Sequence, residues 1–66
     1  MATPIQALRS AFTAARFAEI NDIPASACRN ARARRRLIRG GHAQPLSPSD
    51  KGVVTRRVNA QIKAAA

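Results

Sequence analysis

Residues 16–36, with the sequence RFAEINDIPASACRNARARRR, decide how this chain folds. An apolar segment with helical spacing ends at Asn21, and Asp22 and Pro24 interrupt it. Proline lacks an amide hydrogen and disfavours helical geometry at the residue before it, so the helix should stop here. Small residues follow, and six arginines lie between residues 29 and 39. The stretch therefore predicts a helix, a tight turn and a second helix with dense positive charge.

The N-terminal segment predicts a helix that begins at Pro4, with Thr3 as its N-cap, because proline suits the first turn of a helix. Phe12 and Phe17 are separated by about 140° around a helix, which is too wide for one straight apolar face. We therefore expect a bend or break at residues 10–13, where the threonine at position 13 caps a second short helix that ends near the turn.

The arginine-rich helix is expected to run from residue 24 or 25 to Arg39. Gly40 and Gly41 then supply a left-handed cap. The apolar side of this helix consists mostly of small residues with Ile38, so the helix should lie at the edge of the core.

The C-terminal helix, at residues 48–66, follows a loop at residues 42–47. Ser47, Pro48 and Asp50 form a capped helix start with the acid in the first turn, which favours a helix of about 16 residues.

An apolar stripe runs along this C-terminal helix and consists of Val54, Val58 and Ile62. The stripe can pack back onto the N-terminal helix, or it can pair with a second copy in a homodimer. The sequence leaves both roles open.

Charge is the dominant feature of the composition. The chain has 66 residues and a net charge of +9, from twelve Lys and Arg against three acids. A chain of this charge repels itself and attracts polyanions. Most of the cations are arginine, which forms planar forked pairs with phosphate and with guanine. The composition therefore predicts nucleic acid as a partner.

Several other classes are disfavoured by the sequence. The only cysteine, Cys28, excludes an internal disulfide and suggests a small core residue in an intracellular, cytoplasmic protein. The only histidine, His42, and three scattered acids form no catalytic constellation, so we expect no enzyme, cofactor or metal site. No long apolar run is present, and the basic helix lacks the large apolar side chains needed to enter lipid, so we expect no membrane partner.

The stretch FAEINDIPASACRNA resembles the helix-turn-helix motif of small DNA-binding repressors and regulators. Phe17 and Ala18 match the contact between the two helices, Ile23 follows the turn, and Cys28 and Ala31 match residues that pack the second helix. The resemblance implies an all-α, single domain of three to four helices. Its helix-turn-helix-like segment covers about residues 13–39 of a helical region at 1–41.

The resemblance also implies how the second helix would contact DNA. Arg29 would bind guanine as a fork and Asn30 would pair with adenine, while arginines further along would hold phosphates. The predicted nucleic-acid-binding residues are Ser26, Arg29, Asn30, Arg32, Arg34, Arg35, Arg36, Arg39, Arg56 and Arg57.

The predicted function is that of a small helix-turn-helix transcriptional regulator that binds duplex DNA in preference to RNA, as a homodimer through Val54, Val58 and Ile62. One alternative is a basic protein that binds RNA or is embedded in a ribonucleoprotein or virion, with the arginine-rich helix in an RNA groove. Another is a small phage-type protein that binds a larger protein partner, such as RNA polymerase, through its final helix.

Overall fold

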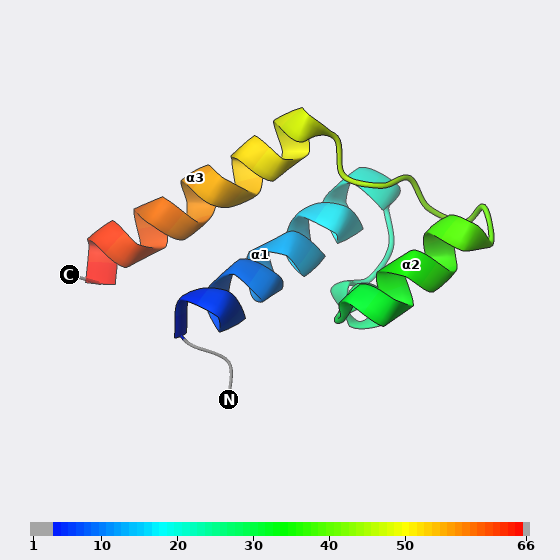
Figure 1. Cartoon of the computed structure of the whole chain (residues 1–66), viewed down its shortest axis with the longest axis horizontal. Helices are drawn as coiled ribbons and strands as arrows, with labels where there is room; N and C mark the ends of the chain where they lie inside the picture. Colours follow the sequence, from blue (N-terminus) through cyan, green and yellow to red (C-terminus); the bar gives the residue numbers. More distant parts are fainter. Residues whose placement is uncertain (1–3, 66) are drawn as a thin grey trace.

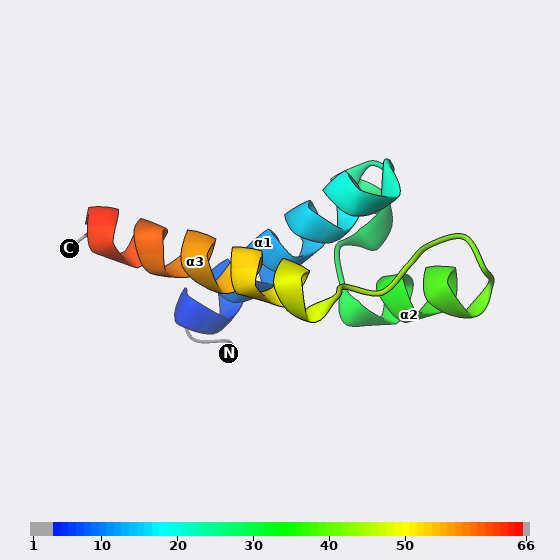
Figure 2. The same ribbon diagram turned by 90° about the horizontal axis from the view of Figure 1, so that it is seen from above.

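The computed structural model describes residues 4–65. Its elements, in chain order, are helix α1 (Pro4–Asn21), the 3-10 helix η1 (Ala25–Cys28), α2 (Ala31–Arg39) and α3 (Pro48–Ala65). Helix α3 runs beside α1, and α2 lies at the end of the molecule remote from the start of α1 and the end of α3 (Figures 1 and 2). The predicted all-α class is confirmed.

Helix α1 begins at Pro4 as predicted, whereas the predicted N-cap, Thr3, lies outside the described residues. The predicted break at residues 10–13 is wrong, because α1 is continuous. The hydroxyl of Thr13 donates to the carbonyl oxygen of Arg9 at 2.8 Å within the helix. A continuous helix is tolerated because α1 packs against both α3 and η1, so apolar residues on more than one side find partners.

The turn after α1 forms where the sequence predicts it. Asp22 adopts a left-handed backbone conformation with φ 52°, and the amide of Ile23 donates to the carbonyl of Ala18 at 3.2 Å. The side chain of Asn21 then binds both backbone groups of Gln44, accepting from its amide at 2.7 Å and donating to its carbonyl at 3.1 Å. One asparagine therefore joins the end of α1 to the loop that precedes α3.

The predicted single helix from residue 24 or 25 to residue 39 is wrong, because the segment is divided into η1 and α2. Asn30 separates the two as the N-cap of α2, with extended backbone angles of φ −125° and ψ 165°. Its Oδ1 accepts from the amide of Ala33 at 2.8 Å. A short polar side chain that satisfies a helix-start amide favours this position over a helix interior, which explains the division.

Helix α2 ends at the two glycines, as predicted. Gly41 has φ 78°, its amide donates to Ile38 at 3.1 Å, and the amide of His42 donates to Leu37 at 2.9 Å. This pair of bonds satisfies the last carbonyls of the helix and requires a residue that adopts a left-handed conformation without strain.

Helix α3 starts at the predicted cap. The Ser47 hydroxyl accepts from the amide of Asp50 at 3.1 Å, and the Asp50 carboxylate accepts from the amide of Ser47 at 3.1 Å. Of the predicted stripe, Val54 and Val58 are buried, and Ile62 is 40% exposed. Among the described helices α3 contacts α1, so the two valines are used in packing within the single chain, which is one of the two roles that the sequence left open for the stripe.

The centre of the core lies between α1, η1 and the loop after α2. Phe17, Cys28 and Ala43 are buried together there. Cys28 is fully buried, which confirms its expected role as a small core residue, and burial raises the pKa of its thiol. Partly buried residues that pack against this cluster are Ala18, Ile23, Leu37, Ile38 and Leu46. Through Leu37 and Ile38, α2 is attached by one side and presents its other side outward.

Candidate nucleic-acid interface

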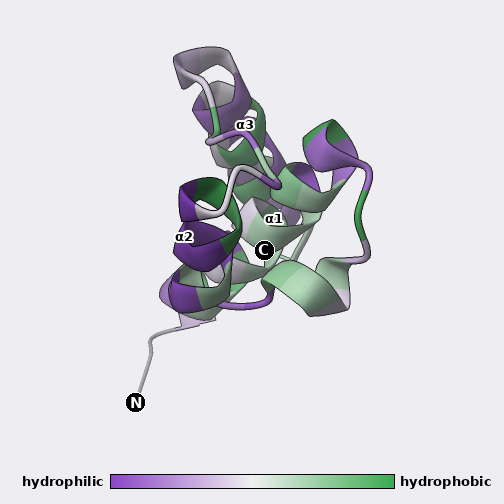
Figure 3. Ribbon diagram, turned by 90° about the vertical axis from the view of Figure 1, so that its right-hand side faces the viewer, coloured by the Kyte–Doolittle hydropathy of each residue, from purple (hydrophilic) through white to green (hydrophobic). Residues whose placement is uncertain are grey.

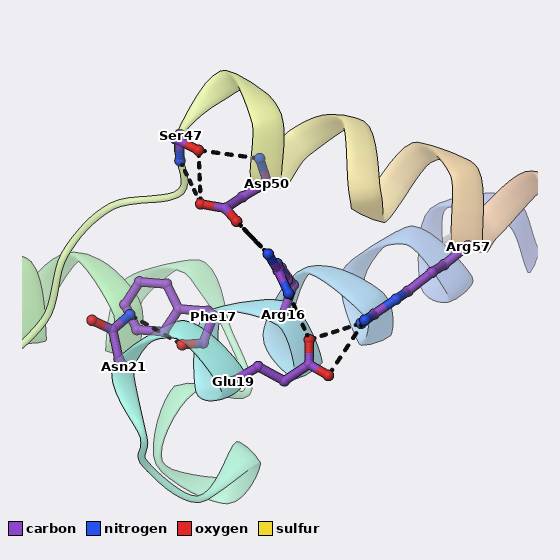
Figure 4. A network of polar contacts seen from close by, with 7 residues as sticks. All are labelled: Arg16, Phe17, Glu19, Asn21, Ser47, Asp50 and Arg57. Carbon is purple, nitrogen blue, oxygen red and sulfur yellow. Dashed lines mark hydrogen bonds and ion pairs between the residues drawn. The ribbon is translucent and has the colours of Figure 1, made fainter.

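Two acids and two arginines form a network between α1 and α3 (Figure 4). Nη2 of Arg16 lies 2.8 Å from Oδ1 of Asp50, and Nη1 of Arg57 lies 2.9 Å from Oε1 of Glu19. Arg16 also pairs with Glu19 at 3.4 Å. Arg57, a predicted nucleic-acid-binding residue, therefore forms an ion pair that joins two helices of its own chain.

The network shifts the pKa values of its members. The hydrogen bond from Arg57 lowers the pKa of Glu19, and hydrogen bonds from Ser47, with a further contribution from Arg16, lower the pKa of Asp50. The hydrogen bond to Asp50 raises the pKa of Arg16. The two carboxylates and the Arg16 guanidinium therefore favour their charged forms, and the ion pairs of the network hold α3 against α1.

Arg34 also turns toward its own fold. Its Nη1 donates to the carbonyl oxygen of Cys28 at 2.8 Å, and its side chain is half-buried. This carbonyl belongs to the last residue of η1, so the guanidinium satisfies an acceptor where η1 ends and α2 is about to begin. The sequence placed Arg34 among the nucleic-acid-binding residues, and the structure places it in this internal contact.

Four arginines on α2 remain directed outward. Each of them lies three residues from one of the others and four from another, which puts them on one side of the helix, and all four are exposed. They line a shared surface hollow and form the arginine face of α2, which consists of Arg32, Arg35, Arg36 and Arg39. In Figure 3 the α2 ribbon is coloured as predominantly hydrophilic.

Among the described residues, no acid pairs with this positive charge. Helix α2 contains no Asp or Glu, and the ion pairs found in residues 4–65 involve none of the four arginines. Their guanidinium groups therefore keep their hydrogen-bond donors available for an external anion. Arg56, exposed on α3, is not brought together with them, because α2 and α3 share no contact within the described helices.

The predicted base-reading residues are placed differently from expectation. Asn30 caps α2, and its side-chain oxygen is used in that cap. Ser26 and Arg29 are exposed at η1, where they border a shallow hollow against α1. Residues 22–30 separate α1 from α2, whereas a helix-turn-helix joins its two helices by a turn of three to four residues. No α-helix carries residues 25–30, so the expected recognition surface is not formed as a helix.

A further surface feature was not foreseen from the sequence. An apolar groove lies between the start of α1 and the end of α3, and its lining residues are Pro4, Ile5, Leu8, Gln61, Ile62 and Ala65. Ile5 and Leu8 share one face of α1, and Ile62 continues the stripe of α3. The apolar stripe of each helix is visible in the sequence. Only the side-by-side packing of the two helices shows that both stripes extend past the buried valines and line an open groove.

Among residues 4–65, no three His, Cys, Asp or Glu side chains gather where they could hold a metal ion. None of the helices in the same range has the length and apolar character needed to cross a membrane. Comparison with protein-family models, curated proteins and solved structures finds no match to this chain.

Proposed function

We propose that this protein binds duplex nucleic acid, with DNA preferred, through contacts between phosphates and the arginine face of α2. The observation that carries the proposal is the arginine face itself, because its four guanidinium groups are exposed, share one side of a helix and have no acid on that helix. Three other arginines make contacts within the chain, and these are Arg16, Arg34 and Arg57. The four arginines of the face are therefore left for a ligand.

The spacing of the face suits a polyphosphate. Arg32 and Arg39 are seven residues apart, which corresponds to about 10.5 Å along a helix. Duplex DNA carries one negative charge per about 1.7 Å of its axis, so about six phosphates occupy the same length. Four fixed positive charges over this distance approach the density of the ligand. A single phosphate or carboxylate ligand would leave most of the face unused.

The preference for DNA over RNA follows from the dimensions of the groove that an α-helix such as α2 must enter. The major groove of B-form DNA admits an α-helix between its two phosphate backbones, whereas the major groove of A-form RNA is deep and narrow. Asn30 is a helix cap and residues 25–28 form a 3-10 helix, so this segment is not expected to contact bases. Binding then depends on contacts between the arginine face and phosphates. Binding should therefore depend weakly on sequence.

The test is a fluorescence anisotropy titration of the chain against a random-sequence DNA duplex and the matching RNA duplex, each over a series of salt concentrations. Four phosphate contacts on DNA correspond to a slope of about −3.6 in log K against log salt, at about −0.9 per contact. A variant with all four arginines of the face replaced by glutamine should lose most of this slope.

The matched control removes the same number of charges elsewhere. Its substitutions are Arg9→Gln, Lys51→Gln, Arg56→Gln and Lys63→Gln, all at exposed positions outside α2. We expect this control to retain more of the affinity and the slope than the variant of the arginine face. Equal losses in both variants would show that net charge alone drives binding, and tighter binding to RNA would refute the preference for DNA.

A further inference from the structure

Helix α2 is attached to the rest of the molecule along one side only. Helices α1 and α3 lie side by side, whereas α2 stands apart from them at the right of Figures 1 and 2. Its backbone approaches that of η1 and, among the described helices, neither α1 nor α3. None of its residues is buried, and Leu37 and Ile38, which pack against the core cluster, are only half-buried. Elements that bury little apolar surface are the ones that open locally.

Helix α2 is also short. It has nine residues, whereas α1 and α3 have 18 residues each and both contain buried side chains. Helices shorter than about 12 residues are marginal in water without tertiary contacts. Beyond Leu37 and Ile38, α2 relies on the Asn30 cap and on the bond from Arg34 to the carbonyl of Cys28. The closed position of α2 therefore depends on a small set of contacts.

The arginine face acts against the helix that carries it. Residues three or four positions apart are neighbours on a helix surface, and like charges at these spacings destabilise the helix. None of the four arginines is relieved by an ion pair among the described residues. The face contains four such repulsive pairs, which are Arg32 with Arg35, Arg32 with Arg36, Arg35 with Arg39, and Arg36 with Arg39.

The start of α2 adds a further unfavourable contact. The N-terminal end of a helix carries partial positive charge, which favours acids and disfavours cations in the first turn. Arg32 is the second residue of α2, and the first turn contains no acid, whereas α3 has Asp50 in its first turn. Arg36 and Arg39 lie in the last turn, where positive charge is favourable. The electrostatic penalty is therefore concentrated at Arg32.

An anion on the arginine face reverses this balance, because phosphates placed beside the guanidinium groups replace repulsion with attraction. A ligand that binds only the closed helix stabilises that state by mass action. We infer that α2 opens in the free chain while α1 and α3 stay packed, and that a polyanion on the arginine face holds α2 closed. The part that concerns the ligand rests on the proposed function, whereas the opening of α2 in the free chain does not.

Amide hydrogen exchange, measured by NMR on the 15N-labelled chain, tests the opening. In the absence of ligand, the amides of residues 35–39 should exchange faster than those at the centres of α1 and α3. Raising NaCl from about 10 mM to about 1 M shortens the screening length from about 30 Å to about 3 Å. This change should slow the exchange of α2 amides more than that of α1 and α3 amides, because the repulsion within the face is screened.

Arg32→Glu tests the electrostatic cause without any ligand. The substitution removes two repulsive pairs, creates attractive pairs with Arg35 and Arg36, and places an acid in the first turn. Exchange of the α2 amides should slow by about tenfold. The matched control is Arg56→Glu, which makes the same change of net charge at an exposed position of α3 with no charged residue three or four positions away. It should leave the exchange of α2 unchanged.

The same measurement with duplex DNA tests the ligand. At a DNA concentration about 100 times the Kd, exchange of the α2 amides in the unchanged chain should slow by about a hundredfold, up to the limit set by unfolding of the whole domain. The variant with glutamine at the four positions of the arginine face should show no such slowing.

The outcomes separate this inference from the proposed function. Exchange of α2 in the free chain as slow as that of α1 and α3, or equal rates in Arg32→Glu and Arg56→Glu, would overturn the opening of α2. If α2 opens as expected and DNA neither binds nor slows its exchange, the opening stands and the proposed function fails. If anisotropy shows DNA binding and α2 is not slowed more than α1 and α3, the proposed function stands and the coupling to α2 fails.

Discussion

The guanidinium of Arg16 on α1 lies 2.8 Å from the carboxylate of Asp50 on α3, and the same carboxylate accepts hydrogen bonds from the amide and hydroxyl of Ser47. The residue that helps to start α3 is thus the residue that holds α3 against α1 (Figure 4). Local capping and tertiary packing are coupled through one side chain. A change at the start of α3 should therefore affect the whole domain.

Replacement of Ser47 by alanine should reduce the free energy of unfolding by about 1 kcal/mol, because an N-cap hydroxyl is lost, whereas replacement by glycine should cost only a few tenths. Urea unfolding followed by circular dichroism measures both. Equal costs for alanine and glycine would contradict the capping role.

Acid should destabilise the fold through Glu19 and Asp50. The ordinary pKa values of these groups are 4.5 and 3.8, and both are lowered in the folded chain. A carboxyl group with a lower pKa in the folded state stabilises that state above its unfolded pKa, and this contribution disappears as the pH falls through the folded pKa. The free energy of unfolding should therefore fall as the pH is lowered below 4.5.

Urea titrations at a series of pH values measure this dependence. Glu19→Gln removes one of the two carboxyl groups whose pKa is lowered by folding and should flatten the curve in acid. An unfolding free energy that is constant between neutral pH and about pH 3 would contradict the assigned network.

Substitutions of Asn30 can separate its role as a helix cap from its predicted role in base recognition. Asn30→Ser retains a capping oxygen and should preserve stability, whereas Asn30→Ala should cost about 1 kcal/mol. Neither change should alter the preference among DNA sequences, measured by competition between duplexes. A change of base preference in Asn30→Ser, with stability retained, would restore the base-reading role.

Adjacent arginines on α2 should behave in opposite ways. Arg34→Gln removes a charged donor from the carbonyl of Cys28 and should reduce stability by about 1 to 3 kcal/mol. Arg35→Gln, on the arginine face, should change stability by less than about 0.5 kcal/mol. It should lower the salt slope of DNA binding by about 1. Urea unfolding and anisotropy on the same two proteins test this contrast, and identical behaviour would show that the two side chains are equivalent.

Cys28 should react slowly with thiol reagents in the folded chain. It is fully buried, and burial raises the pKa of its thiol, so little thiolate is exposed to attack. Labelling with iodoacetamide, followed by mass spectrometry, should be slow in buffer and fast in urea. Rapid labelling of the folded protein would mean that the core cluster around Phe17 is open.

Much of the local structure could be predicted because the relevant signals act over a few residues. The start of α1 at Pro4, the left-handed turn at Asp22, the glycine end of α2 and the cap at Ser47 all depend on the conformational limits of single residues or on a side chain reaching its neighbour's backbone. The division between η1 and α2 at Asn30 also depends on a local signal, because asparagine is a favoured N-cap. The residues on both sides of Asn30 have a composition typical of helices, so the sequence predicted one uninterrupted helix.

The candidate interface could be predicted only in its composition. The sequence shows that the region around residues 29–39 is rich in arginine, but it does not distinguish Arg34, which binds a carbonyl, from Arg35, which faces outward. It likewise does not show that Arg57 meets Glu19, 38 residues away in the chain. These assignments depend on which groups are brought within hydrogen-bond distance by packing.

The sequence by itself determined the helical class, the strong positive charge and most helix ends, because periodicity, charge and capping are properties of short segments. The tertiary structure alone decided that α1 stays continuous between two packing partners, that Val54 and Val58 are used inside the chain, and which arginines are left exposed. The physical reason is distance. Burial and ion pairing depend on residues far apart in the chain, and their proximity exists only once α3 lies against α1.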